Sequence, residues 1–335
     1  MRKMAALSGI FVLGAILICI LPSTGLAAAI SKPMLLALSS FTAKTPVPIG
    51  ECAILLGGSM LVFGWIKCMI GWMIRRDRKP LTHIAGISMV TLSALLLSGA
   101  LLWLPIARTA QWTMPFTHDK GALMQLCDDL LDQANALSVM QPEADAYDRL
   151  TIAQSAQHAL KLIAGDRNVR IKFARYPEVF SHLNIAGIMM PWTGEAIVDG
   201  AQPLLTLPFA ALHEACHQLG FGREDEANYL AYRACMNGDR IFRYSGTMYA
   251  LMYTMQSVRR VDSAAWLDAT QRMNERVHWD FYRMNGYENA HLTKRVQSLN
   301  AVSDVFLRLG HQAGLLSYGR VVDLLLADPL GVGAG

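Results

Sequence analysis

Three long stretches of apolar residues occupy the first third of the chain, over about residues 4–30, 52–74 and 83–106. Within them, Lys67 is the only Lys, Arg, Asp or Glu. An α-helix rises about 1.5 Å per residue, so each stretch is long enough to cross the ~30 Å hydrocarbon core of a bilayer. The pattern therefore predicts a transmembrane region over residues 1–107, with two to three membrane-spanning helices.

The first stretch has a second interpretation, because the alanines at 27–29 are small enough for signal-peptide cleavage. Both interpretations leave the other two spans in the same orientation. Four basic residues crowd the segment 75–79 between those spans, and basic loops of this kind stay in the cytoplasm. The third span then ends outside, so we expect residues 108–335 to form an extracytosolic domain of a multi-pass cell-membrane protein.

Beyond residue 107 the apolar residues take up the spacing of a folded domain. Helical spacing covers residues 119–137 and 143–164, and a strand-like alternation covers residues 169–176. Residues 182–198 have the pattern of one or two further strands, and residues 207–327 are almost wholly helical in pattern. We therefore expect an α+β, mostly helical domain that follows the membrane helices.

Charge changes at the same boundary. The whole chain has a formal net charge of +4, but residues 1–107 hold nine Lys and Arg against two Asp and Glu, whereas residues 108–335 hold 21 against 24. The basic excess thus belongs to the segments that flank the membrane, and nucleic acid is not expected as a partner. With 53% hydrophobic and 17% charged residues, the chain is expected to contact membrane lipid instead.

One motif in the domain carries recognisable chemistry. His213 and His217 are four residues apart, so a helix places them on one face, and Glu214 lies beside them. Two imidazoles supply half of a tetrahedral zinc site, and an adjacent carboxylate can accept a proton from a zinc-bound water. The uncharged neighbours are typical of a buried helix, which Gly220 should end. In the alternative interpretation, hydrogen bonds alone satisfy the two buried histidines.

A zinc site of this type needs a third protein ligand. Glu224 is the first candidate, because it lies near the start of a second helix, predicted over about residues 223–236, after a short turn. Asn228 lies one turn further on the same face, where it could support a zinc-bearing histidine. Glu226 points to another face and is the alternative ligand. These acids are also of the kind that the helix dipole favours at any helix N-terminus.

Several runs of this sequence are similar to those of a known family. The runs are Leu207 to Phe209, His213 to Phe221, Arg223 to Tyr229 and Tyr244 to Gly246, with weaker ones at 187–195 and 317–324. In them the chain resembles the bacterial membrane-protein family catalogued as domain of unknown function 3810, over most of its length. The resemblance implies a membrane location and a zincin-like site of the gluzincin type, but no substrate. The spacing from Glu224 to Asn228 also resembles the Glu-x-x-x-Asp of membrane zinc peptidases that process prenylated proteins, with asparagine in place of aspartate.

Together these features predict a membrane-bound zinc metallopeptidase. One Zn²⁺ would be held by His213, His217 and Glu224. Glu214 would take a proton from the zinc-activated water and pass it to the leaving amine of the peptide. Tyr244 is a candidate donor of a hydrogen bond to the oxyanion, and a buried helix tyrosine is the alternative interpretation.

The expected substrate is a peptide or protein at the membrane surface. In zincins an edge strand holds the substrate backbone by strand addition, and residues 185–191 are our candidate for it, with an ordinary structural strand as the alternative. Two other functions stay open, namely a catalytically inert zincin fold that binds a cell-envelope partner and a non-peptide zinc hydrolase. The intact Glu214 argues against the inert fold, which has no need of it.

Overall fold

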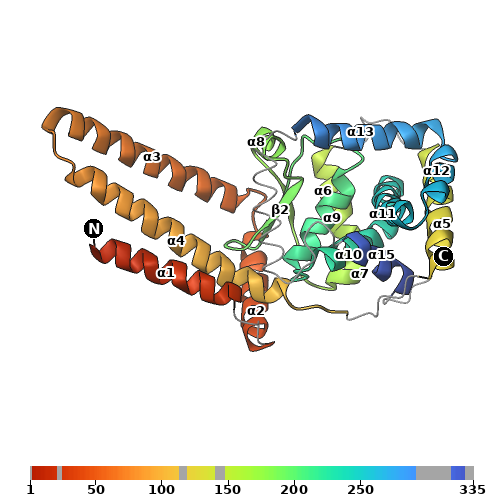
Figure 1. Cartoon of the computed structure of the whole chain (residues 1–335), viewed down its shortest axis with the longest axis horizontal. Coiled ribbons are helices and arrows are strands. Elements are labelled where there is room, and N and C mark those ends of the chain that lie inside the picture. Colours follow the sequence, from red (N-terminus) through yellow and green to blue (C-terminus); the bar gives the residue numbers. More distant parts are fainter. Residues whose placement is uncertain (1, 21–24, 113–118, 140–147, 292–317, 329–335) are drawn as a thin grey trace.

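The structure, a computed structural model, describes residues 2–20, 25–112, 119–139, 148–291 and 318–328. It is mostly helical, as expected, and includes one three-stranded sheet. Figure 1 shows an arm of N-terminal helices that extends from a compact part, which holds the sheet and the later helices.

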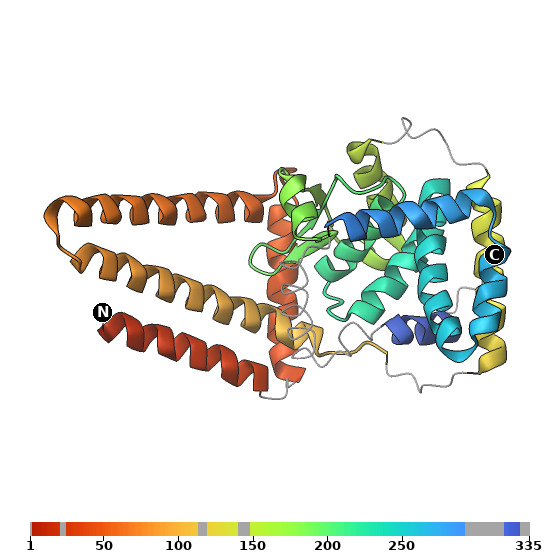
Figure 2. The same ribbon diagram turned by 45° about the horizontal axis from the view of Figure 1, so that its top comes forward.

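Three helices make up the arm, namely α1 (Arg2–Ile20), α3 (Ile49–Arg75) and α4 (Lys79–Ala107). Helix α4 packs against both α1 and α3 (Figures 1 and 2). Helices α3 and α4 are 27 and 29 residues long and apolar enough to cross a membrane. On α3, large apolar side chains such as Phe63 and Ile74 are 69% and 75% exposed. Water solvates such a surface poorly and lipid solvates it well, which supports a membrane association.

The expected first span is wrong in its bounds. One span over about residues 4–30 was expected, but α1 ends at Ile20 and a separate helix, α2 (Gly25–Thr42), follows. Figure 2 shows α2 crossing the base of the arm, next to the compact part. Continuous hydrophobicity therefore did not mean a continuous helix.

The sheet has the order β1-β3-β2, formed by β1 (Ile171–Phe173), β2 (Gly187–Met190) and β3 (Glu195–Val198). Strand β1 is parallel to β3, and β2 is antiparallel to it, with Ile188 opposite Ile197. The strands expected within 169–176 and 182–198 are thus confirmed. In the part of the chain that the structure describes, β2 is an edge strand, as expected for residues 185–191.

Helix α9 (Leu207–Gln218) is the centre of the compact part. It packs against the sheet, α10 (Glu224–Met236) and α11 (Arg240–Val261), and every residue of α9 except His213 is buried. The surrounding helices are α5 (Lys120–Ser138), α6 (Arg149–Ala159), α7 (Lys161–Ala164), α8 (Pro177–His182), α12 (Ser263–Gln271), α13 (Glu275–His291) and α15 (Tyr318–Ala327). The helix expected over 143–164 begins at Arg149 in the structure, and residues 143–147 lie outside the described residues.

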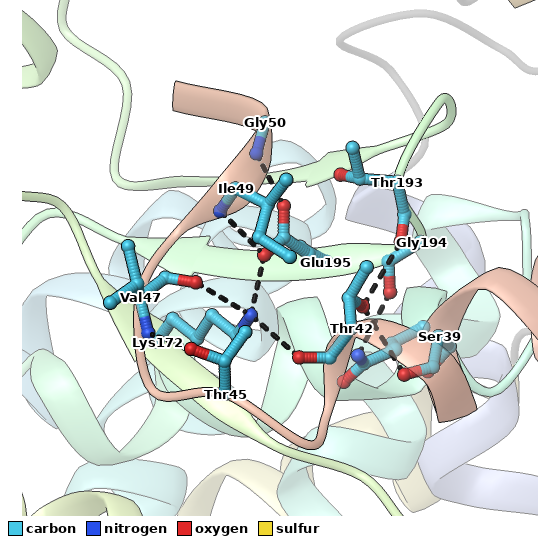
Figure 3. A network of polar contacts seen from close by, with 11 residues as sticks. Ser39, Thr42, Thr45, Val47, Ile49, Gly50, Lys172, Thr193, Gly194 and Glu195 are labelled. Atoms are coloured by element: carbon cyan, nitrogen blue, oxygen red, sulfur yellow. Dashed lines mark hydrogen bonds and ion pairs between the residues drawn. The ribbon is translucent and has the colours of Figure 1, made fainter. Parts of the chain in front are cut away.

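A buried ion pair fastens the arm to the sheet (Figure 3). Lys172 of β1 and Glu195 of β3 are in direct contact, and neither side chain is exposed. The Lys172 ammonium also donates to the backbone carbonyls of Thr42, at the end of α2, and Val47, in the α2–α3 connection, each at 2.9 Å. The backbone N–H groups of Ile49 and Gly50 donate to Glu195 at 2.9 and 2.6 Å. Glu195 thus accepts from N–H groups in the first turn of α3 that have no partner within the helix, at the end where the helix dipole favours a negative charge.

Candidate metal centre

The turn between α9 and α10 brings the motif residues together. His213 and His217 lie one turn apart on α9, and Glu224 is the first residue of α10. The predicted helix end is confirmed, because α9 ends at Gln218 and Gly220 has a φ of 86°. Glycine adopts that conformation without strain, and the chain turns back there into α10.

The nitrogen and oxygen atoms of these three side chains face one point. The Nε2 atoms of His213 and His217 are 3.1 Å apart. Of the Glu224 carboxylate oxygens, Oε2 lies 3.3 Å from Nε2 of His213 and Oε1 lies 3.4 Å from Nε2 of His217. Four ligand atoms at about 2.0–2.1 Å around a tetrahedral zinc ion lie about 3.3 Å from one another. One ligand atom from each of the three side chains lies within 4.8 Å of the others, so together they could hold a metal ion.

A backbone carbonyl decides which nitrogen of His217 faces the cluster. The Nδ1 atom of His217 lies 2.7 Å from the carbonyl oxygen of Phe221. Because a carbonyl can only accept, Nδ1 carries a hydrogen, and Nε2 has a lone pair for a metal ion whenever the ring is neutral. The Trp103 ring of α4 packs edge to face with the same imidazole, at 5.4 Å between centroids. A hydrogen bond from the other ring nitrogen to a backbone carbonyl, like that of Nδ1 here, is usual for a metal-ligating histidine.

Electrostatic attraction holds the three side chains to one another. Burial by itself lowers the pKa of His217, but the adjacent Glu224 carboxylate outweighs burial and raises this pKa to about 9. Burial likewise raises the pKa of Glu224, yet the two imidazoles hold it well below its usual range. A positive charge beside the Glu224 carboxylate is thus strongly favoured, whether it is a proton on an imidazole or a metal ion.

Glu214 lies beside the cluster on the same helix, with a buried carboxyl group. It is 7% exposed, and its Oε2 atom has no hydrogen-bond partner among the described residues. Burial raises the pKa of this carboxyl group, and the two neighbouring histidines oppose the rise. Because an unsatisfied buried carboxylate is costly, this is a position that a bound molecule would complete.

The edge strand β2 begins against Glu214. A Cβ atom on Gly187, the first residue of β2, would lie only 2.6 Å from Cγ of Glu214. Any residue but glycine would push the strand and the carboxyl group apart. The sequence placed Gly187 in the predicted edge strand but gave no sign of this contact.

The other polar residues considered on α10 make different contacts. Glu226 accepts hydrogen bonds from the backbone N–H groups of Gln111 and Trp112, at 2.6 and 3.2 Å, and burial raises its pKa to about 7. Asn228 accepts a hydrogen bond from the Tyr253 hydroxyl at 3.2 Å, and none joins it to a histidine in the described part of the chain. Of the two candidate acids, the fold brings Glu224 to the histidines.

Tyr244 is fully buried, and its hydroxyl group donates to Asp280 of α13 at 2.9 Å. No hydrogen bond joins it to the cluster among the described residues, so its role as an oxyanion donor stays a prediction from the sequence. Besides Trp103, two aromatic residues of the described chain lie near the cluster, namely Phe209, 6.4 Å from the His213 ring, and Tyr249, which stacks on Phe209 at 4.1 Å. Sequence reasoning missed both, since helical periodicity does not tell which neighbour an aromatic residue meets.

Comparison with known proteins connects the chain to a family. A family model described as "Protein of unknown function (DUF3810)" matches residues 28–326. No curated protein and no solved structure matches the chain. The family match includes the two long apolar helices as well as the cluster on α9 and α10.

Proposed function

We propose that this chain, which belongs to the DUF3810 family, is a membrane-bound zinc metallopeptidase. One observation carries the proposal: ligand atoms of His213, His217 and Glu224 all lie within 4.8 Å of one another, next to the buried carboxyl group of Glu214. Three protein ligands leave one zinc position open, which is the mark of a catalytic rather than a structural site.

The chain's own part in hydrolysis falls mainly to Glu214. Zinc in this site would supply a Lewis acid that polarises a peptide carbonyl and lowers the pKa of a water molecule. The Glu214 carboxylate takes the proton of the attacking water and then delivers it to the leaving amine. Its Oε2 atom accepts no hydrogen bond from the described residues, so no protein contact competes for that proton.

Strand β2 offers a way to hold a peptide at this carboxyl group. The outer edge of an edge strand presents N–H and C=O groups that pair with an extended chain. Because Gly187 brings the strand against Glu214, a peptide paired with β2 would pass its carbonyl groups close to the carboxyl group. This arrangement favours a peptide over other hydrolysable substrates.

The cluster lies against the end of a membrane helix. Trp103 of α4 contacts His217, and a Cβ atom on Gly222 would lie 2.6 Å from the backbone of Ile106 and Ala107. If α4 crosses the bilayer, its end would hold the site near the membrane surface. We infer that the substrate is a peptide or protein segment at the membrane surface.

Metal and activity measurements test this function. The purified full-length protein is expected to contain about one zinc ion per chain and to hydrolyse members of a fluorogenic peptide library. Glu214→Gln should keep the zinc and lower the hydrolysis rate by roughly 10²–10⁴-fold, as loss of a general base does. The exposed Glu178→Gln is the matched control and should change neither value. A metal-free protein, or full activity in Glu214→Gln, would exclude the mechanism.

We also propose that the compact part lies outside the cytoplasm. The basic segment 75–79 joins α3 to α4 at the far end of the arm from the compact part (Figures 1 and 2), and such segments stay inside. A reporter that is active only outside the cytoplasm should be active when fused after Arg108 and silent when fused at Arg76. The opposite pattern would place the cluster inside the cell.

A further inference from the structure

A small cavity lies beside the start of α9. Its volume is about 80 Å³, which suits the end of a long side chain. In its wall, Ala186 directly precedes Gly187, which lies against Glu214. Tyr249, also in the wall, stacks on Phe209 beside the histidines. A peptide that pairs with β2 therefore has this cavity within reach of its side chains.

Asp199, just after β3, is the charged residue among those that line the cavity in the described chain. It is fully buried. Its Oδ2 atom accepts hydrogen bonds from the hydroxyl groups of Ser181 and Tyr287, at 2.7 and 3.0 Å, and its Oδ1 atom accepts one from the backbone N–H of Ala201 at 2.8 Å. A carboxylate has about four lone-pair positions, so Oδ1 keeps one for a further donor.

Among the described residues no ion pair joins Asp199 to a cation, although the Arg149 guanidinium packs against Gly200, the next residue. Asp280 is a useful comparison for Asp199, because it is also buried and also accepts a hydrogen bond from a tyrosine hydroxyl. Unlike Asp199, it forms an ion pair with Arg276, at 2.7 Å. A buried carboxylate without a cation is costly. A cation brought in by a ligand would offset that cost.

We propose that the cavity binds a lysine side chain of the substrate and that Asp199 determines this specificity. The inference rests on the proposed peptidase function, which supplies the peptide. Ile185, Pro203 and Met284 line the cavity and would contact the four-carbon stem, while the ammonium group donates to Asp199. The small volume favours the compact ammonium group of lysine over the planar guanidinium fork of arginine.

Peptide binding tests the pocket without hydrolysis. The protein is full-length Glu214→Gln in detergent with zinc, and the probes are dye-labelled alanine hexapeptides that carry lysine or norleucine at each position in turn. At one of the six positions, the lysine peptide should bind about tenfold more tightly than the norleucine peptide, as measured by fluorescence anisotropy. Adding Asp199→Asn should remove the preference, whereas the matched Asp280→Asn should keep it.

A second variant covers the case in which Asp199→Asn does not fold. Met284→Trp fills the cavity and should bring the lysine peptide down to the affinity of the norleucine peptide. Equal binding at every position, no binding of any peptide, or a preference that survives both variants would overturn the pocket. If the protein prefers lysine peptides but the wild-type protein hydrolyses none, the peptidase function is wrong and the lysine pocket stands. If the wild-type protein hydrolyses peptides without any preference for lysine, the pocket is wrong and the peptidase function stands.

Discussion

Replacing Glu224 by alanine is expected to weaken zinc binding about a thousandfold. Structural zinc sites with four protein ligands bind with about 10–16 kcal/mol, so one protein ligand is worth up to roughly 4 kcal/mol. The Glu224 carboxylate lies 3.3 and 3.4 Å from the two Nε2 atoms, so no other described side chain takes its place without movement of α10. Competition with a chelator of known affinity measures the change in the dissociation constant.

Two neighbours on α10 provide the controls. Glu226→Ala should keep zinc, because that side chain binds the backbone after α4 rather than the histidines. Asn228→Ala should keep it as well, because its amide oxygen accepts from Tyr253. If Glu226→Ala is the variant that loses zinc while Glu224→Ala keeps it, the ligand assignment is wrong.

Replacing Lys172 by methionine is expected to destabilise the protein by about 3–5 kcal/mol, because it leaves the buried carboxylate of Glu195 without its cation. Burial raises the pKa of Glu195, but the Lys172 ammonium and the N–H groups of Ile49 and Gly50 hold it below its ordinary value. The same lysine binds the α2–α3 connection (Figure 3), so the loss also loosens the arm. Thermal unfolding in detergent measures the change.

The double variant separates charge from packing. Lys172→Met combined with Glu195→Gln removes both charges, so it should recover much of the lost stability. A single variant that is as stable as the wild-type protein, or a double variant that is less stable than the single one, would show that the ion pair does not fasten α3 to the sheet.

Several features of this protein follow from the sequence alone because they depend on neighbouring residues. Length and apolarity were enough to predict α3 and α4 as helices that can cross a membrane. The spacing of His213 and His217 placed both on one face of a helix, and Gly220 marked its end, as the structure confirms. The expected span over 4–30 failed because hydrophobicity says nothing of where a helix breaks or turns.

Contacts between distant segments were decided only by the tertiary structure. The sequence left Glu224 and Glu226 open as ligands, since helical spacing separates their faces but does not tell which face meets α9. The approach of Gly187 to Glu214 depends on how the sheet packs against α9. The cavity at Asp199 depends on three elements, α8, α11 and α13, whose side chains meet only in the folded chain. Periodicity fixes which side of an element is buried, whereas packing fixes what that side touches.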